Sequence, residues 1–557
     1  MVNSHQHGKA TAFVYRPIAL AAMTLIAVGA QAAEIDVGNP DLAIRWDNTV
    51  KYSVASRLNS ADPALLSNPN NDDGNRNFDK GLISNRLDLY SELDITYQKS
   101  LGVRFSLAAW NDSSYTGTHA NPGFPGGAFP NQGSVAYNQF TDATRKVHGN
   151  HAELLDAFVF GKFDLGGSSA TVRAGRHGLI WGESLFFGGN AIAGGQMPVD
   201  GVKLISVPNT QFKEAIRPVP MLSGQVQINS NVSVGAYVQT TSSISRVPAV
   251  GSYFSNSDQA VEGGESILLG GALVAQRTAD VRAQNSGQGG VQLRIRGEDT
   301  DFGLYAIRFH SKTPQVVTNL GMIPGGPPVP VPTSYTQVYH EGITALGASA
   351  SRTFGSHNIA IEGSIRKNQD LASSQAVNLA GLGLLATNNS DNPGYAVGNT
   401  AHVNLSVLGS LEPNALWKEA SLVGELAWNR VLSISKNAAA ADPNATRDGV
   451  ALRLVLEPMY RGVFDGIDIS VPMGLGWAPH GSRPMAMSPN AWIPEGGGDV
   501  SVGLNASYRD AWRFSLAYTH YFGGAKSFND MTNNNAYSWG QTLKDRDFIS
   551  ASVRYSF

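Results

Sequence analysis

Residues 547–557, the last eleven, read Asp-Phe-Ile-Ser-Ala-Ser-Val-Arg-Tyr-Ser-Phe, and the interpretation of the whole chain starts from them. From Ile549 onward, apolar and polar residues alternate without a break, and Ile549, Ala551, Val553, Tyr555 and Phe557 share one side. Because successive side chains of a strand point to opposite faces, this period of two predicts a β-strand with one apolar face. A soluble protein could cover that face with a second sheet, so the strand alone leaves the class of protein open.

The strand also ends on the final residue, an aromatic one, with a second aromatic two positions before it. This ending resembles the closing strand of bacterial outer-membrane barrels, in which the terminal aromatic is the assembly signal. The resemblance implies that Tyr555 and Phe557 are the membrane-assembly signal, recognised by the barrel-assembly machinery. Individual barrel strands carry weak signals, so the remaining sequence has to decide.

Composition narrows the classes. The 557 residues contain no cysteine, which suits a chain exported through an oxidising compartment without disulfides. The net charge of −3 gives no basic surface for nucleic acid, so no nucleic-acid partner is expected. Charged residues are only 15% and glycines number 61, which favours short strands and loops over helices. No apolar run beyond the leader approaches the roughly 18 residues of a transmembrane helix.

The first 32 residues have the three parts of a signal peptide. Lys9 and Arg16 precede the apolar run Ile18–Val28, and Ala30-Gln31-Ala32 places small residues where a signal peptidase cleaves. The alternative, a buried N-terminal helix, is disfavoured because the run is short and a polar segment follows it closely. We therefore expect export to the periplasm and a mature chain of residues 33–557.

Eighteen segments of the mature chain show period-two alternation, and those at 42–57, 152–163 and 170–177 are the weakest, so that sixteen strands is the alternative. Pro458 and Pro472 fall inside two segments, where a proline costs a ladder hydrogen bond. The predicted strands are 42–57, 84–97, 101–112, 152–163, 170–177, 219–229, 232–240, 289–297, 301–312, 341–353, 356–367, 400–411, 420–432, 448–460, 466–477, 499–508, 512–522 and 547–557.

The connections between these segments alternate strictly between short and long. Outer-membrane barrels have short periplasmic turns and long surface loops, whereas a soluble sandwich has no reason to sort its loops in this way. The pattern predicts an all-β fold: a single transmembrane antiparallel β-barrel in the cell outer membrane, with both termini periplasmic. A barrel in lipid must close, because an open edge would leave backbone groups without partners. Aromatics near strand ends are expected to form the interfacial girdles: Tyr97, Tyr460, Trp477, Tyr508, Trp512 and Phe557.

One long connection, 178–218, does not look like an ordinary surface loop. It contains Trp181, Phe186 and Phe187 and is interrupted by glycines. We expect this segment to fold into the lumen as a constriction, where its aromatics grip an apolar solute. The predicted solute-binding residues are Arg176, Trp181, Glu183, Phe186, Phe187 and Asp200, with Arg176 and Glu183 as polar partners. The alternative is a surface loop whose aromatics pack on neighbouring loops.

A second segment, Asn68–Asn75, is dense in turn-forming and acidic residues. Its composition suggests a calcium loop, but Pro69 stands where the first acidic ligand of such a loop should be. The sequence therefore favours a solvated turn, and no metal site is predicted.

Several motifs resemble a large uncharacterised proteobacterial family, domain of unknown function 1302, over essentially the whole mature chain. They are Arg173-Ala-Gly-Arg176 with Trp181-Gly-Glu-Ser184, Asn77-Phe-Asp-Lys-Gly81, Ser91-Glu-Leu-Asp-Ile95, the run Asp301–His310 and the run Tyr460–Pro472. The resemblance implies an outer-membrane barrel of a family often encoded near large export-type transporters and a periplasmic partner family, so a periplasmic partner and an inner-membrane transporter are expected partners. It also implies traffic of hydrophobic compounds, and it supplies no catalytic residues.

The chain lacks the motifs of zinc proteases, α/β-hydrolases and phosphate-binding loops, so neither catalytic residues nor a cofactor are predicted. His520 lies on a lipid-facing position, where packing is the more common role. The predicted function is a channel or transporter for a hydrophobic or amphiphilic small molecule. A general or anion-selective porin is the alternative, because the predicted inward positions carry charges of both signs. An outer-membrane hydrolase and a purely structural role are the alternatives of other classes.

Overall fold

The structure is a computed structural model that describes residues 33–124, 130–207, 210, 212–270, 273–323, 325, 328–481, 486 and 492–557. The predicted signal peptide, residues 1–32, lies outside the described residues. Among the described residues, no helix is long and apolar enough to cross a membrane.

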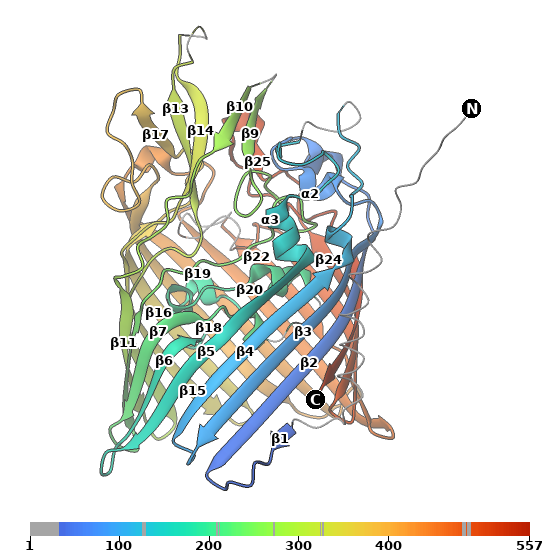
Figure 1. The fold of residues 1–557 in the computed structure, drawn as a ribbon, viewed down its shortest axis with the longest axis vertical. Coiled ribbons are helices and arrows are strands. Elements are labelled where there is room, and N and C mark those ends of the chain that lie inside the picture. Colours follow the sequence, from blue (N-terminus) through green and yellow to red (C-terminus); the bar gives the residue numbers. More distant parts are fainter. Residues whose placement is uncertain are drawn as a thin grey trace, which may run out of the picture.

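Eighteen antiparallel strands form one closed barrel (Figure 1). β21 and β22 together occupy a single position in the wall, and β27 pairs with β2 to close it. The wall strands, in chain order, are β2 (Leu42–Arg57), β3 (Gly81–Tyr97), β4 (Leu101–Asp112), β5 (Asn150–Asp164), β6 (Ser169–His177), β7 (Val219–Gln227), β8 (Val232–Gln239), β11 (Gln288–Arg296), β12 (Thr300–Phe309), β15 (Ile343–Phe354), β16 (His357–Asp370), β18 (Val397–Leu411), β19 (Glu419–Lys436), β20 (Asp448–Phe464), β21 (Ile467–Ser470), β22 (Met473–His480), β23 (Gly498–Tyr508), β24 (Trp512–Phe522) and β27 (Phe548–Ser556).

All eighteen predicted strands are therefore confirmed, including the three weakest, and the sixteen-strand alternative is wrong. The two prolines behave differently. Pro458 lies inside β20 opposite Ala420, whereas Pro472 separates β21 from β22. A proline has no N–H to give to the ladder, and the break between Ser470 and Met473 is the consequence.

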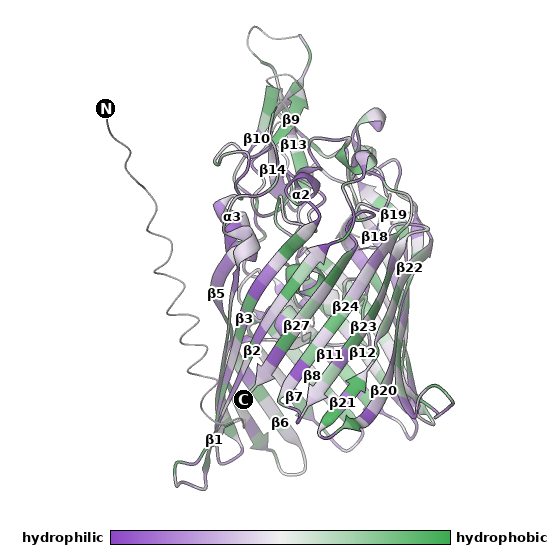
Figure 2. Cartoon of the chain, turned by 90° about the vertical axis from the view of Figure 1, so that its right-hand side faces the viewer, coloured by the Kyte–Doolittle hydropathy of each residue, from purple (hydrophilic) through white to green (hydrophobic). Residues whose placement is uncertain are grey.

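The barrel wall is apolar outside and polar inside. Along β3, Arg86 and Asp88 are buried at 3% and 8% exposure on the inner face. Figure 2 shows hydrophobic and hydrophilic residues alternating along the tilted strands. Large exposed apolar side chains cover the outer face, among them Tyr52, Phe105, Val159, Leu222, Val238, Val291, Leu304, Leu346, Ile361, Leu405, Val502 and Leu516. Because exposed apolar surface on this scale is stable only in lipid, the fold is a transmembrane barrel.

The short turns lie at one end of the barrel together with the C-terminus and β1 (Ala33–Ile35), and the long loops gather at the other end (Figure 1). The loops build a second, five-stranded sheet from β9 (Ser266–Gly270), β10 (Leu273–Arg277), β13 (Gln315–Gly321), β14 (Val331–Val338) and β17 (Val377–Gly381), and a small hairpin from β25 (Asn529–Asp530) and β26 (Ala536–Tyr537). Their helical turns are η1 (Pro63–Leu66), α2 (Asp73–Arg76), η2 (Ser113–Tyr115), α3 (Asp142–Thr144), η3 (Arg145–Gly149), η4 (Gly188–Asn190), α4 (Ala193–Gln196), α5 (Gly201–Ser206), α6 (Phe212–Ala215), η5 (Ala438–Ala440) and η7 (Met531–Asn533).

The interpretation of Asn68–Asn75 as a solvated turn is wrong. Asn68, Asn71, Asp72, Asp73 and Asn75 are all buried, and α2 begins inside this segment. Residues 249–258 cover the segment, because the loop after β8 folds across it. This burial results from the packing of several loops above the barrel. A local pattern of turn-forming residues carries no information about such packing.

Candidate functional site

Segment 178–218 leaves the wall after β6, contacts lumen-facing side chains of β8, β12, β16, β18 and β19, and returns to the wall at β7. Two carboxylates of the wall bind its backbone. Glu362 accepts hydrogen bonds from Glu183 N at 2.7 Å and Ile192 N at 2.6 Å, through different oxygens. Gly182, with φ +95°, packs so closely on Glu362 that a Cβ atom there would lie 2.1 Å from its carboxylate. Glycine at this position is thus required by both the turn and the approach to the wall.

Glu425 of β19 binds the next turn of the segment. Its Oε2 accepts hydrogen bonds from the backbone N–H groups of Leu185 at 3.1 Å, Phe186, and Phe187 at 2.8 Å. Its other oxygen accepts a hydrogen bond from Asn404 Nδ2 at 2.6 Å. A carboxylate that receives several N–H groups holds a loop more firmly than neutral contacts do, because charged acceptors make the stronger bonds.

Asn190 is a fully buried anchor of the segment. Its Nδ2 lies 2.9 Å from Asn404 Oδ1, and its Oδ1 lies 2.9 Å from both His402 Nδ1 and Asn429 Nδ2. Arg366 donates to the carbonyl oxygens on either side of it, Gly189 O at 2.9 Å and Ala191 O at 2.8 Å. None of these anchoring residues was predicted, since a lone asparagine in a glycine-rich stretch has no distinguishing signal.

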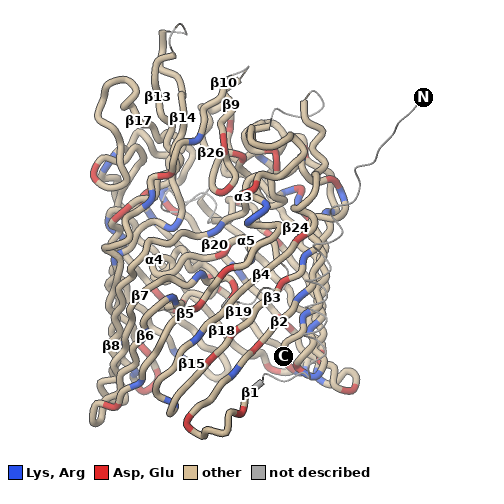
Figure 3. The backbone as a smooth tube through the Cα atoms, viewed as in Figure 1, with Lys and Arg blue, Asp and Glu red and all other residues tan. Residues whose placement is uncertain are grey.

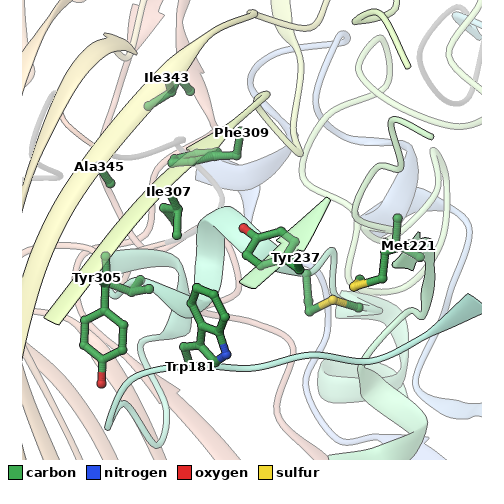
Figure 4. Close-up of a cluster of buried hydrophobic side chains, with 11 residues drawn as sticks. Trp181, Met221, Tyr237, Tyr305, Ile307, Phe309, Ile343 and Ala345 are labelled. Carbon is green, nitrogen blue, oxygen red and sulfur yellow. The ribbon is translucent and has the colours of Figure 1, made fainter. Parts of the chain in front are cut away.

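The three predicted aromatics lie in different environments. Trp181 is 6% exposed, with its ring edge-on to Tyr237 at 5.0 Å and near Tyr305 at 6.4 Å (Figure 4). Phe187 is 9% exposed and packs against Trp492 at 5.6 Å. Phe186, by contrast, is 38% exposed. Trp181 and Phe187 therefore anchor the segment, and Phe186 is the predicted aromatic whose ring is free to meet a solute.

The three predicted charged residues are also separated. Glu183 lies 3.9 Å from Arg294 of β11, so its nearest cation is not Arg176. Asp200 forms a buried ion pair with Arg246 at 2.6 Å, and Arg246 also pairs with Glu153 at 2.6 Å. Arg176 is still part of β6, on the face opposite Arg173 and His177. It lines a separate pocket together with Arg217 and Arg282, whereas the ion partner of Glu183 is Arg294.

A pocket at the inner wall involves none of these residues. It has a volume of about 650 Å³ and lies on the lumen side of β2–β6, toward the end with the short turns. Its lining residues are Ala43, Ile44, Arg45, Asp94, Thr96, Arg104, Phe158, Phe160, Lys162, Thr171 and Arg173. Basic and acidic residues are interspersed along the strands that carry it (Figure 3). We call it the lumenal pocket.

The charges of the lumenal pocket do not balance. Arg104 forms a two-pronged pair with Asp94 at 2.6 Å in both contacts, and Arg45 pairs with Asp47 at 2.7 Å. Among the described residues, Arg173 and Lys162 have no acidic partner within 4 Å. The Arg173 guanidinium instead lies 5.9 Å from the centre of the Phe158 ring. Free positive charge beside aromatic surface suits an organic anion with an apolar body.

The sequence contained a trace of this pocket. The period-two alternation of residues 152–163 is weak because apolar residues lie on both faces of the strand. Phe158 and Phe160 face the lumen, while Val159 and Phe163, 56% and 48% exposed, face outward. Apolar residues on both faces blur the alternation, and the aromatic pair beside Lys162 is what distinguishes this strand from its neighbours.

A base and its orienting carboxylate do occur on the outer face. His520 Nδ1 lies 2.6 Å from Asp547 Oδ2, which also receives Tyr518 OH at 3.3 Å. Among the described residues, no serine hydroxyl is hydrogen-bonded to His520. The arrangement therefore lacks the nucleophile that a serine hydrolase needs.

A closed barrel with an apolar outer face, a polar inner face and a segment of its own chain held across the lumen defines a lumen-inserted transmembrane β-barrel. The chain belongs to the family described as "Protein of unknown function (DUF1302)", whose model matches residues 15–557.

Solved structures similar to this chain include two Acinetobacter baumannii proteins and one from Pseudomonas aeruginosa. OccAB3 has a TM-score of 0.42 at 8% identity over 92% of this chain and 99% of that chain. OccAB4 has a TM-score of 0.40 at 7% identity over 92% and 98%, and OpdK with vanillate has 0.37 at 10% identity over 92% and 98%. No curated protein matches the chain in sequence.

Proposed function

We propose that the protein is an outer-membrane channel for amphiphilic organic anions, meaning small molecules with an apolar body and a carboxylate-like group. The observation that carries this proposal is the lumenal pocket, where Arg173 and Lys162 have no acidic partner within 4 Å among the described residues and lie beside Phe158 and Phe160. The proposal narrows the hydrophobic or amphiphilic solute expected from sequence. A general porin would need no aromatic surface at this point.

Two parts of the lumen divide the work in this proposal. The pocket near the short-turn end binds the solute, with its anionic group at Arg173 and its apolar body on the phenyl rings. The inserted segment, with Phe186 exposed, forms the constriction that the solute passes. Glu362 and Glu425 hold that constriction in place through backbone hydrogen bonds.

The cellular setting follows from the same proposal. An exported barrel with an apolar outer face is placed in the outer-membrane lipid by the barrel-assembly machinery, and its short-turn end faces the periplasm. A periplasmic partner and an inner-membrane transporter would supply or remove the solute at that end. We propose no enzymatic activity: among the described residues, the candidate base on the outer face, His520, is hydrogen-bonded to Asp547 and to no serine hydroxyl.

The test is block of single-channel current in planar bilayers by three probes: benzoate, benzyl alcohol, which has the ring without the charge, and acetate, which has the carboxylate without the ring. Benzoate carries both the ring and the charge, so it should block at the lowest concentration. Arg173→Gln removes the charge-assisted contact, which is worth about 1.5–3 kcal/mol, and should raise the half-blocking benzoate concentration roughly tenfold to a hundredfold.

The matched control is Arg352→Gln. Arg352 is an exposed arginine of β15 whose guanidinium pairs with the Asp299 carboxylate at 3.1 Å. This variant should leave the block unchanged. Equal block by benzoate and acetate in the wild type would favour a general anion porin. Equal block by benzoate and benzyl alcohol would favour a neutral hydrophobic solute and refute the role of Arg173.

A further inference from the structure

Three buried carboxylates meet among the loops above the barrel. Asp72 and Asp73 lie at the start of α2, in the loop between β2 and β3, and Asp258 lies in the loop after β8. Asp72 and Asp258 are 0% exposed and Asp73 is 5% exposed. One carboxylate oxygen from each lies within 4.8 Å of the others.

The backbone holds the three groups together. Asp258 Oδ2 accepts hydrogen bonds from Asp72 N at 2.7 Å and Asp73 N at 3.2 Å, and Asp258 N donates to Asn70 O at 2.9 Å. A Cβ atom on Gly74 would lie 2.6 Å from Ser255 O and 2.7 Å from Ser252 O, so the two loops are in close contact. The carboxylates therefore cannot move apart without separating the loops.

Their charges are only partly balanced. Arg76 Nε lies 2.7 Å from Asp72 Oδ2 and compensates one of the three carboxylates. Arg546, which lies near Gly74, is paired with Asp545 at 3.2 Å. Two uncompensated negative charges match the charge of one divalent cation.

Two oxygens of the cluster have no hydrogen-bond partner among the described residues: Asp72 Oδ1 and Asp258 Oδ1. Asp442, which is equally buried in another loop, shows how such a group is normally satisfied. Its Oδ1 accepts from Trp539 Nε1 at 2.8 Å and Asn444 N at 3.0 Å, and its Oδ2 accepts from Tyr537 N at 2.8 Å. A fully buried oxygen without a donor is costly, unless a cation takes the donor's place.

We propose that Asp72, Asp73 and Asp258 bind one Ca²⁺ ion, which fastens the loop between β2 and β3 to the loop after β8. Carboxylate oxygens are hard ligands that suit Ca²⁺ and Mg²⁺. Ca²⁺ lies about 2.3–2.6 Å from its oxygens and accepts irregular geometry, so it can bridge oxygens up to about 4.8 Å apart, whereas Mg²⁺ requires shorter and more regular contacts.

The test uses the full-length protein folded in detergent micelles, stripped with EDTA and then dialysed against buffer with CaCl₂ or MgCl₂ at equal ionic strength. Metal content is measured by mass spectrometry and stability by the apparent Tm. We expect one Ca²⁺ per chain and a rise of several degrees in Tm with CaCl₂, larger than that with MgCl₂. Asp258→Asn and Asp73→Asn should abolish both the retained Ca²⁺ and the rise in Tm.

Asp442→Asn is the matched control, since it alters a buried aspartate whose oxygens have donors. It should lower the Tm while one Ca²⁺ per chain is retained. The proposal is overturned if the wild type retains no Ca²⁺ and its Tm is the same with and without CaCl₂. This result needs only the wild type, so it holds even if the variants fail to fold. The proposal is also overturned if Asp258→Asn retains as much Ca²⁺ as the wild type, or if the wild type is stabilised more by MgCl₂ than by CaCl₂. It is overturned too if CaCl₂ raises the Tm of Asp258→Asn above its Tm without the ion.

Discussion

The carboxylate of Glu425 on β19 accepts a hydrogen bond from the backbone N–H of Phe187 at 2.8 Å, which ties the inserted segment to the far wall of the barrel. The same oxygen receives Leu185 N and Phe186 N, so one side chain satisfies a whole turn. Removal of Glu425 leaves these donors without an acceptor in the lumen, where water is the only replacement.

Glu425→Ala should therefore release the constriction. Each lost charge-assisted bond is worth about 1.5–3 kcal/mol, enough to make the turn mobile. Single-channel recordings should show larger or noisier current, while the barrel keeps its resistance to heat in detergent. Glu419→Ala, which removes an exposed partner of Arg461, is the control and should leave the current unchanged. A quiet, wild-type current in Glu425→Ala would contradict the anchoring role.

Deleting residues 178–198 should raise single-channel conductance and admit solutes that are normally excluded. The wall strands pair without this segment, so the deleted protein should still insert and resist heat. Conductance and liposome swelling with sugars of increasing size provide the measurement. If both remain as in the wild type, the segment does not constrict the pore.

Trp181 and Phe186 should have different effects when truncated. Trp181→Ala leaves a cavity in the buried hydrophobic cluster of Figure 4, and such large-to-small changes cost about 3–5 kcal/mol, so its Tm in detergent should fall. Phe186→Ala alters an exposed ring and should leave the Tm nearly unchanged while it changes solute block. A stable Trp181→Ala together with an unstable Phe186→Ala would show that the assignment of the two rings is reversed.

His148 should make the loops sensitive to acid. Burial, with the charges of Arg86 and Arg246, lowers the pKa of His148 to about 3, and its Nε2 accepts a hydrogen bond from Ala249 N at 3.1 Å. Because the folded pKa lies below the unfolded value of about 6.5, the unfolded state binds the extra proton between these values. The contribution of neutral His148 to the free energy of unfolding is therefore fully present above about pH 6.5, and it is lost as the pH is lowered toward 3.

The measurement is the Tm in detergent between pH 7.5 and 4.5 for the wild type and His148→Gln, whose side chain can still accept from Ala249 N. The decline on acidification should be shallower in the variant. Asp73 has the opposite effect on stability, because its pKa is raised and protonation of this carboxyl therefore stabilises the folded state. Since Asp73 is present in both the wild type and His148→Gln, the difference between their two Tm curves reports on His148. Parallel curves would assign the acid sensitivity to another group.

Phe557 should be needed for assembly more than for stability. Its backbone pairs with Asn48 at 2.9 Å and 2.7 Å at the seam between β27 and β2, and its ring stacks on Tyr555 at 5.3 Å. Deletion of Phe557 should lower the amount of barrel in the outer membrane several-fold, while the protein refolded in detergent keeps its Tm. Phe354→Ala, an exposed aromatic at the end of β15, is the control and should assemble normally. Normal amounts of the deleted protein would disprove the assembly signal.

The barrel could be predicted from sequence because each strand reports its own environment. Lipid outside and water inside impose a period of two on every wall strand, and this requirement acts residue by residue, as in Ile549–Phe557. The alternation of short and long connections predicted which end of the barrel faces the periplasm. The alternation is weak in three of the strands, and in β5 the reason is that Phe158 and Phe160 place apolar side chains on the lumen face.

The site could not be predicted in the same way, because its parts come from distant segments. The six residues chosen from 176–200 share a stretch of sequence, but the structure sends Arg176, Glu183 and Asp200 to different cations or pockets and buries two of the three aromatics. The lumenal pocket joins β2, β3, β4, β5 and β6, and the acidic cluster joins Asp72 and Asp73 to Asp258 across two loops. Sequence patterning alone determined the barrel, since that pattern is local; closure of the barrel and crowding of its loops decided which charges meet, since those contacts depend on distances that no local pattern contains.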